Sequence, residues 1–86
     1  MKRKECGGMS VEIEQAFGIV LKKVRAENSL SQEKLAHICD LDRTYISLLE
    51  RGKRKPTIST IFALALGLSV KPSDLVGATE KLLSHE

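Results

Sequence analysis

The sequence has few of the residues from which catalytic, metal and disulfide sites are built. Its 86 residues include two cysteines and two histidines, and they lack the spacing of a zinc site, which needs about four ligands. We find no plausible catalytic triad and no Gly-rich phosphate loop, and the chain is short for a substrate pocket. We therefore expect no enzymatic activity, cofactor, metal or small-molecule ligand. We expect Cys39 to be a small buried apolar residue near a turn.

Long apolar runs are also absent. No stretch approaches the roughly 18–20 apolar residues of a membrane span, and no apolar segment follows the basic residues at the N-terminus as in a secretory signal. We therefore expect a cytoplasmic protein with no membrane partner. Aromatic residues make up 3% of the chain against 42% hydrophobic residues, which predicts a small aliphatic core. A core of this kind often gains stability by dimerisation.

Positive charge is unevenly distributed. The net charge is +3, and 12 of the 14 Lys and Arg residues fall in the first 55 positions. Four of them lie within residues 51–55. Such a run is often only a solvated loop, but here it directly follows a predicted helix.

Helical periodicity and capping residues predict an all-α fold of five helices with short connections. Residues 1–10 are expected to form a flexible tail, with Met9 as an alternative start, and residues 11–86 one domain. The first helix is predicted over residues 11–27. The predicted N-caps of the next two helices are Ser31 and Asp42, and Gly52 ends the third.

The last two helices are predicted from proline and apolar spacing. Pro56-Thr57 opens the fourth helix with Thr57 as its cap, and Pro72 suits the first turn of the fifth. One apolar side of the fourth helix is expected to pack on the core; it consists of Ile58, Ile61, Phe62, Ala65 and Leu68.

Residues 31–56 have the layout of a helix-turn-helix. Leu35 supplies an apolar contact, Ala36 a small residue at the helix crossing, and Asp40 the turn. Ile46 and Leu49 lie on the inner face of the following helix. In this layout the second helix of the pair lies in the DNA major groove, so we expect the chain to bind duplex DNA.

These residues resemble the DNA-binding domain of Cro/C1-type (XRE-like) phage repressors and their bacterial relatives, over about residues 13–76. The resemblance is carried by Ser31-Gln32, Leu35-Ala36, Tyr45-Ile46-Ser47, Glu50-Arg51-Gly52 and Pro56-Thr57, together with Arg25. It implies a lambda-repressor-like fold. Within the family, residues 43–47 look most like the controller proteins of restriction–modification systems, which are short dimeric regulators. One departure is Asp40, where Gly is usual; Asp tolerates the left-handed conformation that the turn needs.

The predicted base-reading residues lie on the outer face of the third helix. Arg43 can donate two hydrogen bonds to guanine, whereas Thr44 and Ser47 can add hydroxyl contacts or be small polar surface residues. Tyr45 can pack at the edge of the core or reach the DNA; the resemblance to controller proteins favours DNA.

The predicted phosphate contacts flank this helix. Gln32 begins the second helix, whose N-terminus favours a phosphate, and the resemblance implies the same role. On the other side we expect contacts from Lys53, Arg54, Lys55 and Thr57. The resemblance also implies an ion pair between Arg25 and Glu50 that orients the reading helix.

Apolar residues in excess of one small core suggest a dimer interface, although they could equally pack within the monomer. The predicted interface residues are Leu64, Leu66, Val76, Leu82 and Leu83. We therefore expect residues 11–86 to form one DNA-binding and dimerisation domain, in a homodimeric transcriptional regulator that binds a pseudo-palindromic operator on double-stranded DNA. Whether it represses or activates depends on where the operator lies. The alternative is an antitoxin-type protein-binding module that also autoregulates its own promoter.

Overall fold

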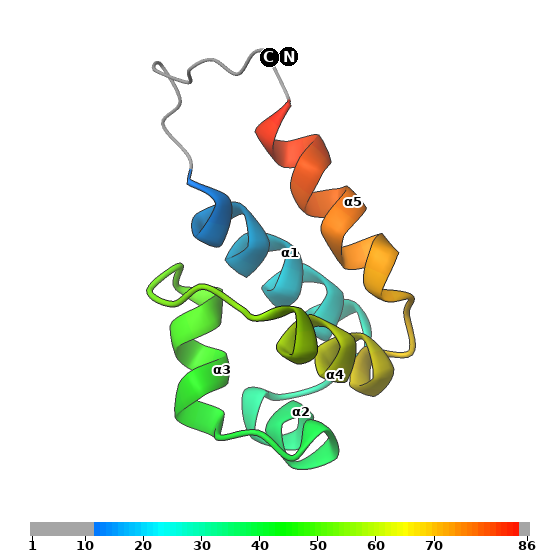
Figure 1. Ribbon diagram of the computed structural model, residues 1–86. Coiled ribbons are helices and arrows are strands. Elements are labelled where there is room, and N and C mark those ends of the chain that lie inside the picture. Colours follow the sequence, from blue (N-terminus) through cyan, green and yellow to red (C-terminus); the bar gives the residue numbers. More distant parts are fainter. Residues whose placement is uncertain (1–11, 85–86) are drawn as a thin grey trace.

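The computed structural model describes residues 12–84, and within them it contains five α-helices and no strand. The helices are α1 (Ile13–Glu27), α2 (Gln32–Cys39), α3 (Arg43–Glu50), α4 (Ile58–Leu68) and α5 (Pro72–Leu83). The prediction of an all-α fold is confirmed (Figure 1). The predicted tail, residues 1–10, lies outside the described residues, as does Cys6.

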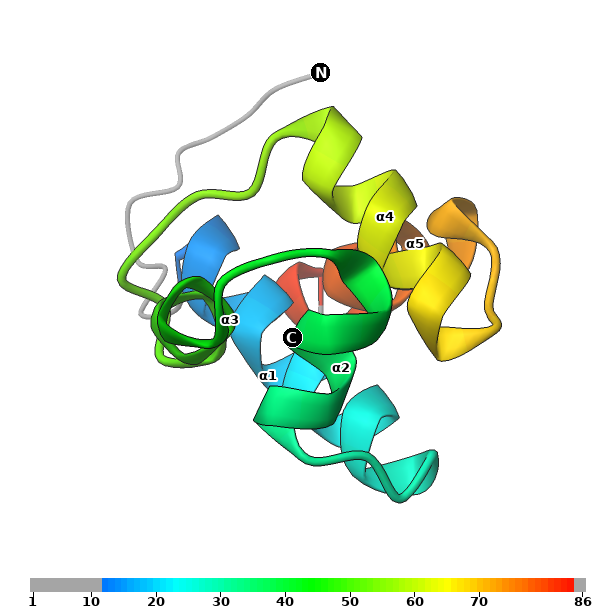
Figure 2. The same ribbon diagram turned by 90° about the horizontal axis from the view of Figure 1, so that it is seen from below.

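The first helix lies between the helix-turn-helix and the last helix. It packs against α3 and α5, whereas α2 packs against α3 and α4. Figures 1 and 2 both show α3 at one side of the molecule, with the start of α5 on the other. No single helix within residues 12–84 is long and apolar enough to span a membrane.

Three side chains cap the helices where the sequence predicts them. Ser31 Oγ accepts a hydrogen bond from the Lys34 N–H at 2.9 Å, and Asp42 Oδ1 accepts one from Thr44 at 3.0 Å. Thr57 Oγ1 accepts one from the Thr60 N–H at 3.1 Å. Each cap satisfies a backbone donor that the first turn of a helix leaves free. The starts of α2, α3 and α4 are therefore fixed by local chemistry.

Two turns use the left-handed backbone conformation. Asp40 has φ 57° and ψ 44° and ends α2, so it takes the conformation that glycine usually supplies in this turn. Gly52 follows α3 with φ 73°, and a Cβ atom there would meet the side chain of Gln15 on α1. The helix-turn-helix therefore keeps its geometry without glycine at its central turn.

The core is largely aliphatic, with Phe17 as its buried aromatic side chain, and it draws residues from all five helices. Its fully buried large side chains are Leu21, Leu35, Ile46, Leu49, Leu64, Leu68 and Leu75. Cys39 is half-buried beside them, and its thiol donates to the Ala63 carbonyl at 3.3 Å. Burial raises the pKa of this thiol, so Cys39 acts here as a packing residue.

The prediction of which side of α4 faces the core is partly wrong. Ile58 and Phe62 are 67% and 59% exposed, whereas Leu64, predicted at a dimer interface, is fully buried in the monomer core. The buried side of α4 instead runs through Thr60, Leu64 and Leu68 at intervals of four residues. Because α4 is apolar almost all round, its periodicity does not identify the side that faces the core.

A glycine permits the close contact between α1 and α3. A Cβ atom on Gly18 would lie 2.5 Å from the Leu49 carbonyl oxygen and 2.6 Å from that of Glu50. Both atoms are backbone atoms at the end of α3, so they move only if the helix moves. The end of the candidate reading helix therefore rests directly on the backbone of α1.

We expect Gly18→Ala to lower the free energy of unfolding by about 1–3 kcal/mol, because the new methyl group pushes α3 away from α1. The control is Gly77→Ala on α5, where a Cβ atom would meet nothing within 4 Å. That change should raise stability by about 0.5–1 kcal/mol, since alanine favours a helix. Urea unfolding measures both. Equal stability of the two variants would contradict the close contact.

Candidate nucleic-acid interface

Helix α3 has one buried and one exposed side. Ile46 and Leu49 are fully buried, as predicted, whereas Arg43 and Thr44 in the first turn are exposed. Ser47 is half-buried and lies one turn further along the helix. Of the four residues predicted to read bases, Arg43 and Thr44 are therefore free to meet a ligand, whereas Ser47 and Tyr45 are partly covered.

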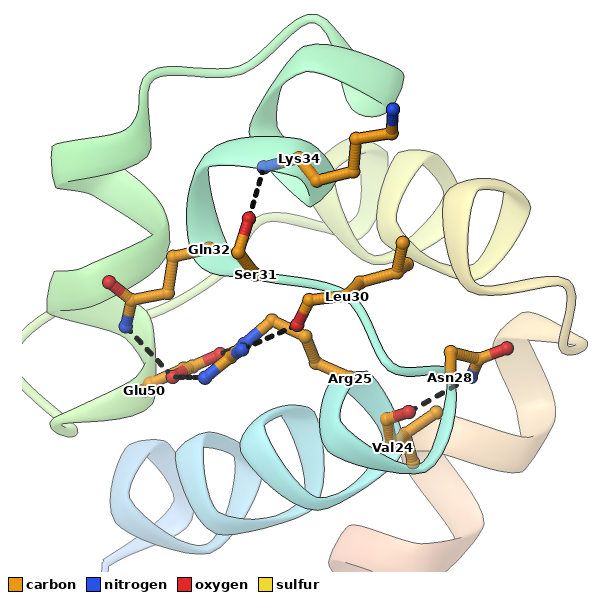
Figure 3. Close-up of polar contacts among 8 residues, drawn as sticks. All are labelled: Val24, Arg25, Asn28, Leu30, Ser31, Gln32, Lys34 and Glu50. Carbon is orange, nitrogen blue, oxygen red and sulfur yellow. Dashed lines mark hydrogen bonds and ion pairs between the residues drawn. The ribbon is translucent and has the colours of Figure 1, made fainter.

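Arg25 and Glu50 form the ion pair that the family resemblance implies. Arg25 Nε donates to Glu50 Oε2 at 2.5 Å, and Nη2 donates to Oε1 at 3.0 Å. A third bond runs from Arg25 Nη1 to the Leu30 carbonyl at 2.7 Å (Figure 3). The side chains are 14% and 3% exposed, so the pair is nearly shielded from water. It ties the end of α1 to the end of α3 and to the loop before α2.

Gln32 joins the same group of side chains. Its Nε2 donates to Glu50 Oε1 at 2.9 Å, which connects the start of α2 to the end of α3 (Figure 3). The sequence predicts a phosphate contact for Gln32 but gives no sign of this bond. A side-chain amide nitrogen carries two hydrogens, so one remains for a further acceptor. We call Arg25, Glu50 and Gln32 the ion-pair cluster.

The cluster favours the charged form of Arg25. Hydrogen bonds to Glu50 raise the pKa of the Arg25 guanidinium above its usual value, and they outweigh the opposing effect of burial. Charge-assisted bonds in two directions fix the plane of its guanidinium as well as its position.

Tyr45 packs partly against the core, and its hydroxyl lies 3.3 Å from Thr60 Oγ1 on α4. Thr60 Oγ1 lies 2.9 Å from Thr57 Oγ1, the cap of the same helix. Thr60 has no role predicted from the sequence, because a threonine in an apolar helix shows no sign of a partner on another helix. The three hydroxyls link α3 to the start of α4.

The basic segment between α3 and α4 is open to solvent. Lys53, Arg54 and Lys55 are all exposed, and so is Thr57 at the start of α4. Thr57 Oγ1 is engaged in capping, as predicted. This cluster of charges directly follows α3 in the chain. In a helix-turn-helix protein, residues at this position can contact the DNA backbone beside the second helix.

The residues predicted at a dimer interface do not share one environment. Leu66, Val76 and Leu82 are exposed, Leu83 is half-buried, and Leu64 belongs to the core as described above. Leu66 is 83% exposed and extends the line of Ile58 and Phe62 at intervals of four residues. We call these three side chains the α4 apolar stripe.

Comparison with known proteins agrees with this fold. A helix-turn-helix family model matches residues 21–75, and the chain belongs to this family. Within it, the chain is similar to control proteins of restriction–modification systems. Control protein C.BamHI of Bacillus amyloliquefaciens is 42% identical over 72 residues, which cover 83% of this chain and 89% of the relative.

Two solved structures extend the likeness. The restriction–modification controller C.AhdI from Aeromonas hydrophila has a TM-score of 0.71 and 39% identity, covering 72% of this chain and 94% of that one. The controller C.Esp1396I, solved as a tetramer in complex with its natural 35 base-pair operator, has a TM-score of 0.75 and 35% identity. That match covers 83% of this chain and 93% of the controller.

The ion-pair cluster predicts a large effect of removing one charge. Arg25→Met should lower the free energy of unfolding by about 3–5 kcal/mol, because it leaves the Glu50 carboxylate buried without its cation. The double variant Arg25→Met with Glu50→Leu should recover part of this loss, since no unpaired charge remains. Urea unfolding of both variants tests this. A loss below about 1 kcal/mol for Arg25→Met, typical of an exposed pair, would contradict it.

Proposed function

We propose that this protein is a sequence-specific DNA-binding transcriptional regulator of the restriction–modification controller kind. It acts as a homodimer on a pseudo-palindromic operator. The observation that carries the proposal is the position of Arg43 and Thr44, exposed in the first turn of a helix whose other end is held by the ion-pair cluster. A relative of this kind binds its operator in a solved structure, which supports the same role here.

Arg43 is the residue proposed to contribute most to base recognition. The first turn of a recognition helix lies nearest the base edges, and a guanidinium can donate to both O6 and N7 of guanine. Thr44 and Ser47 add hydroxyl contacts or meet a thymine methyl group. These contacts supply preference for a base sequence, because each depends on the donors and acceptors that one base pair presents in the major groove.

Contacts to the DNA backbone supply affinity and register. Lys53, Arg54 and Lys55 are exposed between α3 and α4 and meet phosphates on one side of the groove. On the other side, Gln32 donates its remaining amide hydrogen to a phosphate while Glu50 holds the first. These contacts carry no base information, and the charged ones make binding depend on salt.

The α4 apolar stripe is the surface proposed for the homodimer, together with Leu82 and Val76 on α5. Ile58, Phe62 and Leu66 are between 59% and 83% exposed, which is unusual for large apolar side chains along one line of a helix. A single helix-turn-helix meets few base pairs, whereas two related by a two-fold axis meet two half-sites. Burial of the stripe against a second copy meets both requirements.

The experiment that tests the proposal is selection of duplexes from a random library at near-physiological salt, first with the unchanged protein. We expect an enriched inverted repeat with half-sites about one helical turn apart. Arg43→Ala should relax the preference at one position in each half-site. Lys53→Ala should weaken binding to all duplexes alike and reduce the slope of log affinity against log salt by about one.

Two results would count against the proposal. Equal loss on all sequences for Arg43→Ala would remove its base-reading role. Failure of the unchanged protein to enrich any sequence would remove sequence-specific regulation altogether and favour a role in binding another protein.

The dimer has its own test. Phe62→Glu should weaken self-association by about 100-fold or more, because it buries an unpaired charge at the centre of the stripe. The matched control is Ile19→Glu on α1, where the wild-type side chain is 53% exposed and lies outside the stripe. Sedimentation equilibrium measures the mass of both variants. Equal weakening by the two changes, or a monomeric wild-type protein at all concentrations, would contradict the proposed interface.

A further inference from the structure

Two threonines are buried within residues 12–84, and their hydroxyls are used differently. Thr79, on α5, donates to the Leu75 carbonyl at 2.8 Å, one turn earlier in its own helix. Thr60 lies instead between two other hydroxyls, those of Thr57 and Tyr45. The Thr79 bond is local, whereas the Thr60 bonds reach across to α3. Thr60 is therefore the buried polar group that connects the candidate reading helix to α4.

The number of hydroxyl hydrogens limits the directions of the hydrogen bonds among Thr57, Thr60 and Tyr45. Thr57 Oγ1 already accepts the Thr60 N–H, and each of the three hydroxyls has one hydrogen to donate. If Thr57 donates to Thr60 and Thr60 donates to Tyr45, the hydroxyl hydrogen of Tyr45 is left for an acceptor other than these two threonines. In the opposite direction Tyr45 donates this hydrogen to Thr60. An acceptor beside Tyr45 selects the first arrangement, in which each bond polarises the next.

The acceptor that fits is a phosphate oxygen of the DNA backbone. Tyr45 is only half-buried, and its hydroxyl is joined through Thr60 to Thr57, two residues after the exposed Lys55 of the basic segment. Phosphates are proposed to lie beside this segment. A phosphate oxygen only accepts hydrogen bonds, so it matches a phenol that already accepts one from Thr60. We propose that Thr60 is a positioning residue that holds the Tyr45 hydroxyl as a donor to a backbone phosphate. This inference rests on the proposed function, and it assigns Tyr45 to the backbone, not to the bases.

The test compares variants that remove one hydroxyl each. Thr60→Val and Tyr45→Phe should each weaken binding by about threefold per half-site, and so about tenfold for a dimer, because each removes one hydrogen bond's contribution. The double variant should be no weaker than either single one, since both changes remove the same contact. Thr60→Ser keeps the hydroxyl and should restore most of the affinity.

Thr79→Val is the matched control, because it removes a buried threonine hydroxyl far along α5 and should leave DNA affinity unchanged. Affinities are measured by fluorescence anisotropy on the selected duplex and on a shuffled duplex of equal composition. The losses should be equal on both duplexes. Thr60→Val binding like Thr79→Val, additive losses in the double variant, or a loss confined to the selected duplex would each overturn the inference. Failure of the unchanged protein to bind either duplex would instead contradict the proposed function.

Discussion

The buried Glu50 carboxylate is the point on which the geometry of the candidate interface depends. It accepts two bonds from Arg25 and one from Gln32, so the ends of α1 and α3 and the start of α2 meet at one side chain. A carboxylate that is 3% exposed is stable only while these donors surround it. Its need for partners therefore fixes the angle between the two helices of the helix-turn-helix and the direction in which α3 points outward.

Close packing at the same place strengthens this constraint. Gly18 lets the backbone of α1 contact the carbonyls of Leu49 and Glu50, so the end of α3 that carries the carboxylate also packs directly on α1. The first turn of α3 carries Arg43 and Thr44 and stays exposed. One end of the helix is thus anchored by backbone contact and charge, and the other is presented to a ligand. A helix that is already held in place loses less conformational entropy when it binds a ligand.

Features set by neighbouring residues could be predicted from the sequence. The caps at Ser31, Asp42 and Thr57 and the left-handed Asp40 depend only on side chains within three or four positions, and all of them are present. The side of α4 that faces the core could not be predicted, because apolar residues surround this helix and only its neighbours in space decide which are buried. Leu64 was therefore predicted at an interface but is buried in the core, whereas Phe62 was predicted in the core but is exposed.

Contacts between distant residues were predicted only where a family pattern indicated them. The pair of Arg25 and Glu50 came from the resemblance, whereas the bonds of Gln32 to Glu50 and of Tyr45 to Thr60 join residues 18 and 15 positions apart with no pattern between them. Polar residues in such positions show what they can donate or accept, but not which partner the fold supplies. The exposed side chains of α3 were thus easier to predict than the residues that hold the helix in place.

The most direct measurement for the central claim, that α3 lies in the major groove, is methylation interference on the selected duplex. Dimethyl sulfate modifies guanine N7 in the major groove and adenine N3 in the minor groove. We expect methylated N7 to block binding at guanines in two clusters about one helical turn apart, because two copies of α3 read those edges. Interference confined to adenine N3, or none at any guanine, would contradict the proposed docking of the helix.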